Sequence, residues 1–133
     1  MKVMFKESHP LILRPGREGE KWVVVKDWQV VVKSGTKLET ITIPAGFRTD
    51  LASVPRLPFA YWLTGGTANR PAVLHDYIIY KRPWGEAADI FLAAMKAEEI
   101  GYVHRYSMYW AVKAHGMSEY AKSRYKSPPP MAK

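Results

Sequence analysis

The first third of the chain carries the hydrophobic pattern of β-strands. The runs Trp22–Val25 and Trp28–Lys33 are rich in β-branched and aromatic residues, and Lys37–Ile43 alternates polar and apolar side chains. The dipeptide Ser34-Gly35 between the last two runs is typical of a tight turn, so we predict an antiparallel hairpin centred on it. A shorter apolar run, Leu11–Leu13, precedes them. One face of the sheet should be buried and the other exposed to water.

The second half has apolar residues at helical spacing. We predict three helices, the first beginning at Pro71 and continuing to Tyr80, the second over Glu86–Glu99 and the third from about residue 103 or 104 to 121. Gly101 is placed where the second helix should be capped at its C-terminus. The third helix is expected to be interrupted at Gly116.

Between these halves, the segment Pro44–Gly66 contains too many prolines and glycines for a long helix, yet it also holds many large apolar residues. We therefore predict a long structured loop, a type of segment that often carries function. Strands followed by helices define an α+β fold, with an N-terminal antiparallel meander, this loop and about three C-terminal helices. We expect one domain over residues 1–126 and an extended proline-rich tail over residues 127–133.

Composition removes several classes of protein. The 133 residues include no cysteine, which excludes disulfides, thiolate nucleophiles and cysteine-based metal sites. No apolar run approaches the roughly 20 residues that cross a bilayer, and the N-terminus lacks the apolar run of a signal peptide. We expect a soluble protein without a membrane span, made in the cytoplasm.

The formal net charge of +8 is concentrated toward the C-terminus. After His104, six lysines and arginines face a single acid, Glu119, and five aromatic residues are interleaved with them. This composition suits a surface that binds nucleic acid or another polyanion. It equally suits an amphipathic helix whose basic face is solvated, or one that contacts an acidic protein surface.

Two stretches place ionisable side chains among apolar ones, namely Pro44–Arg56 and Leu74–Tyr80. In the second, His75 and Asp76 are adjacent on a helix and point roughly 100° apart, so each needs a partner of its own. Because the connection to the next helix is short, the two helices should form an antiparallel hairpin. Asp89 of the second helix can then lie opposite position 75 or 76. A carboxylate opposite His75 would hold a general base in one tautomer.

Each of these residues also has a structural interpretation. Asp50 and Ser53 fit an Asx turn or a helix N-cap. His75 fits a core histidine that donates to a carbonyl group, and Asp89 fits a first-turn helix carboxylate paired with an arginine. Arg56 fits a residue that binds a loop carbonyl or a neighbouring carboxylate.

The candidate metal ligands are Asp50, His75 and Asp76, a nitrogen and carboxylate set that suits zinc, manganese or magnesium. No HExxH or other metal-binding spacing is present. We therefore expect no cofactor, and keep a divalent metal as an alternative.

Taken together, the blocks Gly-Phe-x-Thr-Asp-x-x-Ser-x-Pro-Arg, ending at Arg56, and His-Asp-x-x-x-Tyr, from His75 to Tyr80, resemble a family. It is domain-of-unknown-function family 1353, frequent in bacteriophage and prophage genomes. The resemblance covers about residues 38–116 and implies a phage origin but no reaction. It draws attention to the motif residues Thr49, Asp50, Ser53, Arg56, His75, Asp76, Tyr80 and Asp89.

A phage origin favours a virion component of the tail, baseplate or neck, or an accessory protein. Such a protein would be made in the host cytoplasm and then incorporated in the particle, where its basic C-terminal helix would contact other phage structural proteins. In this hypothesis the cluster of Asp50, His75 and Asp89 is an internal polar staple, which is stable only if every member is hydrogen-bonded.

The alternative hypothesis is a small phage hydrolase directed at the cell wall or at lipid. His75 would be the general base and Asp89 would orient it, while Asp50 or Asp76 would supply a second carboxylate or a metal ligand. Arg56 would stabilise the oxyanion. A polyanion-binding or nucleic-acid-binding module is a third hypothesis.

Overall fold

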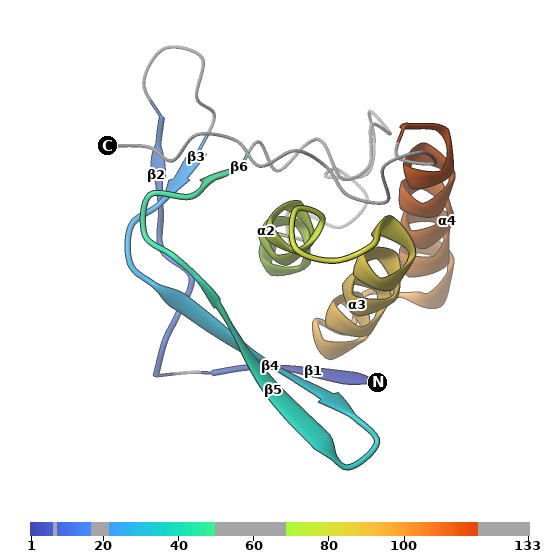
Figure 1. Cartoon of the computed structure of the whole chain (residues 1–133), viewed down its shortest axis with the longest axis horizontal. Coiled ribbons are helices and arrows are strands. Elements are labelled where there is room, and N and C mark those ends of the chain that lie inside the picture. Colours follow the sequence, from blue (N-terminus) through green and yellow to red (C-terminus); the bar gives the residue numbers. More distant parts are fainter. Residues whose placement is uncertain (7, 17–21, 50–68, 120–133) are drawn as a thin grey trace.

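The strands form two small antiparallel sheets, and the helices follow them along the chain (Figure 1). The computed structural model describes residues 1–6, 8–16, 22–49 and 69–119. The first sheet has the order β1-β4-β5 and the second the order β2-β3-β6. This arrangement confirms the predicted α+β class. The strands are β1 (Lys2–Phe5), β2 (Leu13–Pro15), β3 (Trp22–Val24), β4 (Trp28–Ser34), β5 (Lys37–Ile43) and β6 (Arg48–Thr49).

The predicted hairpin is formed by β4 and β5. Ser34 pairs with Lys37, so the two loop residues are Gly35 and Thr36, one position later than predicted. Gly35 has a φ of 63°, at the first loop position where a type II′ turn places its glycine. Along β4, Trp28, Val30 and Val32 are buried, as predicted for a sheet with one face in the core.

Strand β1 was not predicted from the sequence. It pairs with β4, on the side of the hairpin away from β5, with Val3 opposite Val32 and Phe5 opposite Val30. The ring of Phe5 stacks on Trp28 at a centroid separation of 5.9 Å. Four residues give too short a pattern to predict a strand, and β1 depends on β4 for its hydrogen bonds.

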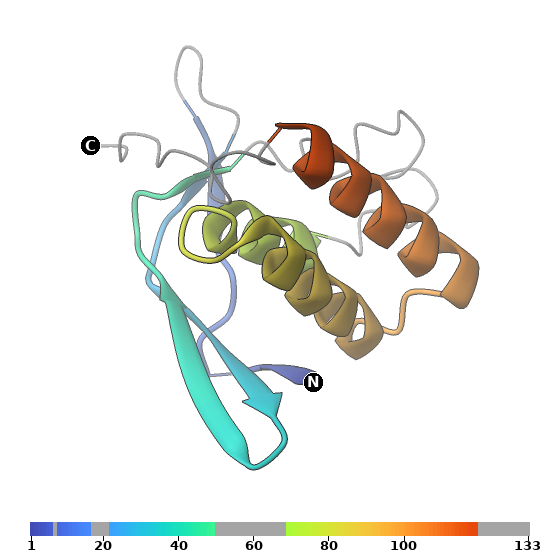
Figure 2. The same ribbon diagram turned by 45° about the vertical axis from the view of Figure 1, so that its right-hand side comes forward.

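Three helices complete the described part of the chain: α2 (Asn69–Ile78), α3 (Trp84–Ala97) and α4 (Tyr102–Glu119). Helices α2 and α3 pack against the buried face of the first sheet, in a core that includes Val30, Leu74 and Ile90. Helix α4 lies outside α3 and runs antiparallel to it (Figure 2). A second cluster that includes Phe91 and Met108 joins these two helices. No helix in the described ranges is long and apolar enough to span a membrane.

The end of α3 differs from the prediction that Gly101 caps it. Glu99 has a φ of 58°, so it occupies the left-handed position that usually belongs to glycine. The amide of Ile100 donates to the carbonyl of Met95 at 3.1 Å, and that of Glu99 to the carbonyl of Lys96 at 3.0 Å. These two hydrogen bonds form a Schellman motif, so the cap lies two residues before the glycine.

Helix α4 continues through Gly116, so the predicted interruption is wrong. A Cβ atom at this position would lie 2.9 Å from Cε3 of Trp84 and 3.1 Å from its Cβ. Gly116 therefore allows the end of α4 to approach the start of α3 closely.

We expect Glu99→Gly to stabilise the protein, because glycine adopts a positive φ without the clash that a Cβ atom causes. The greater freedom of glycine in the unfolded chain removes part of this gain. The net increase in the free energy of unfolding should be about 0.5–1 kcal/mol, measured by urea denaturation. The control is Lys96→Gly, at an exposed right-handed position of the same helix, which should lower stability by about 1 kcal/mol. A loss of stability in both variants would contradict the Schellman motif.

We expect Gly116→Ala to lower the free energy of unfolding by about 1 kcal/mol, although alanine is the better helix former. The new Cβ meets the Cβ of Trp84, which no side-chain rotation can remove, and overpacking outweighs helix propensity. The matched control is Gly85→Ala in α3, where no neighbouring atom lies within 4 Å of the new Cβ. Thermal melts should show the control unchanged or stabilised. Stabilisation of Gly116→Ala to the same extent would show that α4 does not approach Trp84.

Candidate functional site

The two sequence motifs meet where β6 lies beside α2. Thr49 Oγ1 donates a hydrogen bond of 2.6 Å to Asp76 Oδ2, and both side chains are buried. Thr49 belongs to the first motif and Asp76 to the second, 27 positions later in the chain. Burial increases the cost of losing this hydrogen bond.

Apolar contacts join the same two motifs. The ring of Phe47 meets Tyr77 edge-on at a centroid distance of 5.3 Å and Tyr80 at 6.4 Å. Phe47 is 2% exposed. Gly46 before it has a φ of 92°, a backbone conformation that residues other than glycine rarely adopt. The Gly-Phe-x-Thr segment is thus shaped to place one aromatic ring and one hydroxyl group on α2.

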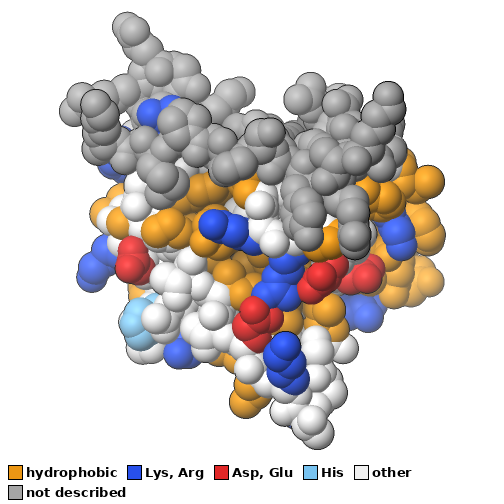
Figure 3. Space-filling model, viewed as in Figure 1, with side chains coloured by type: hydrophobic (Ala, Val, Ile, Leu, Met, Phe, Trp, Pro, Cys, Tyr) orange, Lys and Arg blue, Asp and Glu red, His pale blue; other side chains and the backbone are white. Residues whose placement is uncertain are grey.

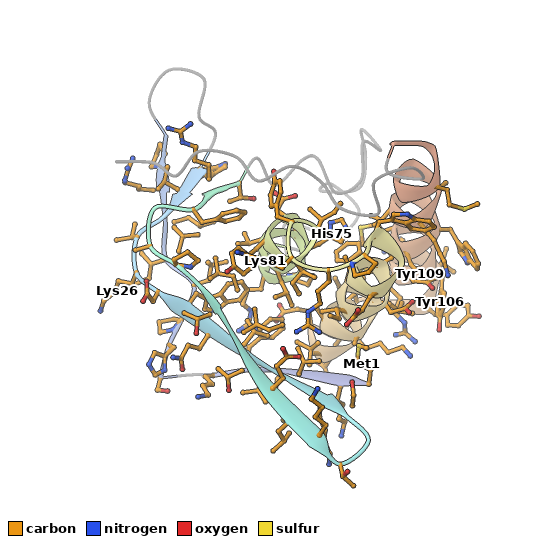
Figure 4. The ribbon with its side chains drawn as sticks, viewed as in Figure 1. Met1, Lys26, His75, Lys81, Tyr106 and Tyr109 are labelled. Carbon is orange, nitrogen blue, oxygen red and sulfur yellow. The ribbon has the colours of Figure 1, made fainter. Side chains whose placement is uncertain are left out.

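His75 points into the interior between α2 and α3 (Figure 4). Its side chain is 5% exposed, and its ring lies 5.2 Å from that of Phe91, centroid to centroid. On a helix, His75 and Asp76 point about 100° apart, and the structure accordingly gives them different neighbours. Thr49 and Asp76 are thus joined on one side of α2, Tyr80 follows the helix and meets Phe47, and His75 lies on the side that faces Phe91 of α3.

The structure does not place Asp89 beside His75, so the predicted base and orienter pair is not formed by these two residues. Asp89 is exposed and accepts a 2.8 Å hydrogen bond from the Tyr109 hydroxyl group of α4. His75 packs on Phe91, and residues two positions apart on α3 point about 200° apart. Asp89 therefore lies on another side of α3.

The contacts of Asp89 form a chain between α3 and α4 that the sequence did not reveal. Lys113 Nζ donates to the Tyr109 hydroxyl group at 3.0 Å, and this hydrogen bond is the main reason that the pKa of Lys113 is raised. The (i, i+4) spacing of Tyr109 and Lys113 was the available signal, but it does not identify the residue on α3 that completes the chain.

The arginines near α3 have other carboxylate partners. Arg70 forms an ion pair with Glu98, and its guanidinium group lies over the ring of Phe5 at 4.4 Å. Arg82 pairs with Glu39 of β5 and with Glu86 of α3, the latter at 2.9 Å. The hydrogen bond between Glu39 and Arg82 lowers the pKa of the carboxyl group and raises that of the guanidinium group. Figure 3 shows acidic and basic side chains next to one another on one face of the molecule.

Metal binding finds no support in the part of the chain that the structure describes. No group of three or more histidine, aspartate or glutamate side chains in those ranges is arranged to hold a metal ion. Asp50, Ser53 and Arg56 lie outside the described residues. Of the candidate ligands, the structure describes His75 and Asp76, and these two lie inside the fold.

The fold and these contacts define a small α+β domain in which a strand-end motif and a helix motif bind each other. Residues 22–112 match the model of a family described as a protein of unknown function (DUF1353), and the chain belongs to that family. The matched segment includes β3 to β6, the helices α2 and α3 and most of α4. Comparison with curated proteins and with solved structures gave no match.

We expect Thr49→Val to lower the free energy of unfolding by about 1–3 kcal/mol. The substitution preserves the shape of the side chain but removes a hydrogen bond from the buried carboxylate of Asp76. Urea denaturation at neutral pH measures the loss. The control is Thr42→Val on the exposed face of β5, which should change stability by less than about 0.5 kcal/mol. Equal effects at both positions would show that the Thr49–Asp76 hydrogen bond contributes nothing specific.

Proposed function

We propose that this protein is a non-catalytic structural component or accessory of a bacteriophage particle, and that its two motifs hold the fold together. The observation that supports this proposal is the buried hydrogen bond between Thr49 and Asp76. It uses a polar residue from each motif to join β6 to α2. The nearby ring contacts of Phe47 have the same effect.

The burial of His75 also favours a structural role over the hydrolase. A general base must approach the proton of its substrate within hydrogen-bond distance, either directly or through one water molecule. The side chain of His75 is 5% exposed and packs on Phe91, and Asp89 contacts Tyr109 instead. The described part of the motif region thus has the properties of a packed interior.

The first test is whether the protein is present in particles. We expect it to co-purify with phage particles on a density gradient and to occur at a fixed copy number in quantitative mass spectrometry. The unassembled protein in the same lysate provides the reference. Its presence in the lysate together with its absence from purified particles would contradict a role as a virion component.

An infection assay with variants of the protein separates the structural role from catalysis. We expect His75→Gln, which retains a polar side chain but not an ionisable base, to give normal particle yield and infectivity if the variant folds. The control is His9→Gln at an exposed position. Removal of a general base typically costs 10²–10⁴-fold in rate. A folded His75→Gln protein with a loss of infectivity of that order would support the hydrolase instead.

A further inference from the structure

Helix α4 has a second apolar face that no described element covers. Its inner face packs on α3 through Met108, Tyr109 and Val112. On the outer side, four large side chains are 58–72% exposed in the structure of the whole chain: Tyr102, Val103, Trp110 and Met117. Hydrophobic side chains gather at the edge of the molecule where α4 lies (Figure 3).

These side chains form a stripe along α4 rather than a scatter of single residues. Tyr102, Tyr106, Trp110, Lys113 and Met117 follow one another at intervals of three or four positions, which places them along one side of the helix. The rings of Tyr102 and Tyr106 lie 4.6 Å apart. Tyr106 is half-buried and also packs against the cluster between α3 and α4, whereas Tyr102 and Trp110 are exposed. We call this stripe, with Val103 and Arg105, the outer face of α4.

Two basic side chains lie beside the outer face, Arg105 and Lys113, and Lys113 also binds the Tyr109 hydroxyl group that donates to Asp89. Arg105 lies 5.6 Å from the ring centres of both Tyr102 and Tyr106. Lys113 lies 5.5 Å from that of Trp110. The cations thus flank the exposed aromatic rings along the helix.

The exposed apolar side chains and the two cations together indicate which kind of partner would bind the outer face. Apolar side chains at helical spacing would fill the space along the rings, and carboxylates beside them would pair with Arg105 and Lys113. We propose that the outer face of α4 is a docking surface for an acidic amphipathic helix of another protein. The inference rests on the proposed function only in assigning that partner to the phage particle.

A second copy of this chain does not supply acidic partners for Arg105 and Lys113. In a two-fold symmetric pair of antiparallel α4 helices centred near Tyr109, Arg105 of each copy would face Lys113 of the other. In a parallel pair, each cation would face its own equivalent. Like charges meet in both arrangements, and such contacts oppose association.

The chain's own C-terminal segment does not complement the charge either. Residues 120–133 contain Lys122, Arg124, Lys126 and Lys133 and no acidic residue. Nucleic acid would supply negative charge, but bases bind chiefly by stacking on free ring faces. Arg105 and Lys113 already lie over rings of the outer face, and Val103 and Met117 offer no ring to stack on. A protein helix uses all of these groups.

The test uses the full-length protein and a synthetic helical peptide as the probe. The peptide has the 18-residue length of α4, with leucines at helical spacing and glutamates beside them. We expect saturable binding by isothermal titration calorimetry, weakened by salt because opposite charges meet. Two control peptides should not bind: one of the same composition in scrambled order, and one with lysine in place of glutamate.

The protein variants locate the binding surface. We expect Trp110→Ala to weaken binding of the acidic peptide at least tenfold, because truncation of a central aromatic side chain removes most of its contact area. The matched control is Leu38→Ala on the β4–β5 hairpin, where the side chain is 64% exposed, and it should bind as the unmodified protein does. Circular dichroism confirms that both variants are folded.

Three results would overturn the inference: no binding of the acidic peptide, equal binding by Trp110→Ala, or tighter binding of a single-stranded oligothymidylate than of the peptide. Self-association in light scattering that Trp110→Ala abolishes would assign the face to a second copy. Incorporation into particles is measured separately. A protein that enters particles but does not bind the peptide refutes the docking surface alone, and the converse refutes the proposed function alone.

Discussion

The burial of a carboxylate on the central helix is the constraint on which the rest of the structure depends. Residues 71–76 of α2 are all buried, so Asp76 cannot reach bulk water from its position. A buried polar group is unfavourable unless hydrogen bonds compensate for it, and Thr49 supplies one such bond. That requirement fixes the end of β6 against α2. The positive φ of Gly46 and the buried ring of Phe47 lie in the segment that leads to Thr49, and they help to place it against α2.

The sequence predicted the elements whose causes are local. Alternating side chains and a turn glycine specify the β4–β5 hairpin, and helical spacing specifies α2, α3 and α4. It failed where a distant partner decides the outcome. Strand β1 exists because β4 offers it an edge, and a glycine stands inside α4 at position 116 because Trp84 leaves no room there for a side chain. Glu99 occupies a glycine position because packing of Ile100 in the core fixes the end of α3.

The candidate site shows the same difference between local causes and distant partners. The sequence predicted a cluster of Asp50, His75 and Asp89, of which Asp50 lies outside the described residues and Asp89 does not meet His75. The contacts between the two motifs are made instead by Thr49 with Asp76 and by Phe47 with Tyr80. The sequence did not predict which side of α3 faces α2. Some apolar residues of α3 pack against α2 and the sheet, and others pack against α4. Asp89 lies between those two faces and therefore meets Tyr109 rather than His75. The phase of a helix packed on two sides depends on both partners, and a single sequence specifies neither.

The division between a closed interior and an open outer helix connects the two proposals. Polar residues of both motifs are used within the fold, around α2, where they stabilise it and are shielded from water. Helix α4 is joined to the domain mainly through α3, and it needs only one apolar face for that contact. Burial of apolar surface contributes roughly 25 cal/mol per Å² to the free energy of folding. An apolar stripe that stays exposed therefore adds nothing to the stability of the isolated domain. Tyr102, Val103, Trp110 and Met117 are explained if another molecule buries them. Under the two proposals, the motif residues hold the domain together and α4 presents its apolar stripe to a partner.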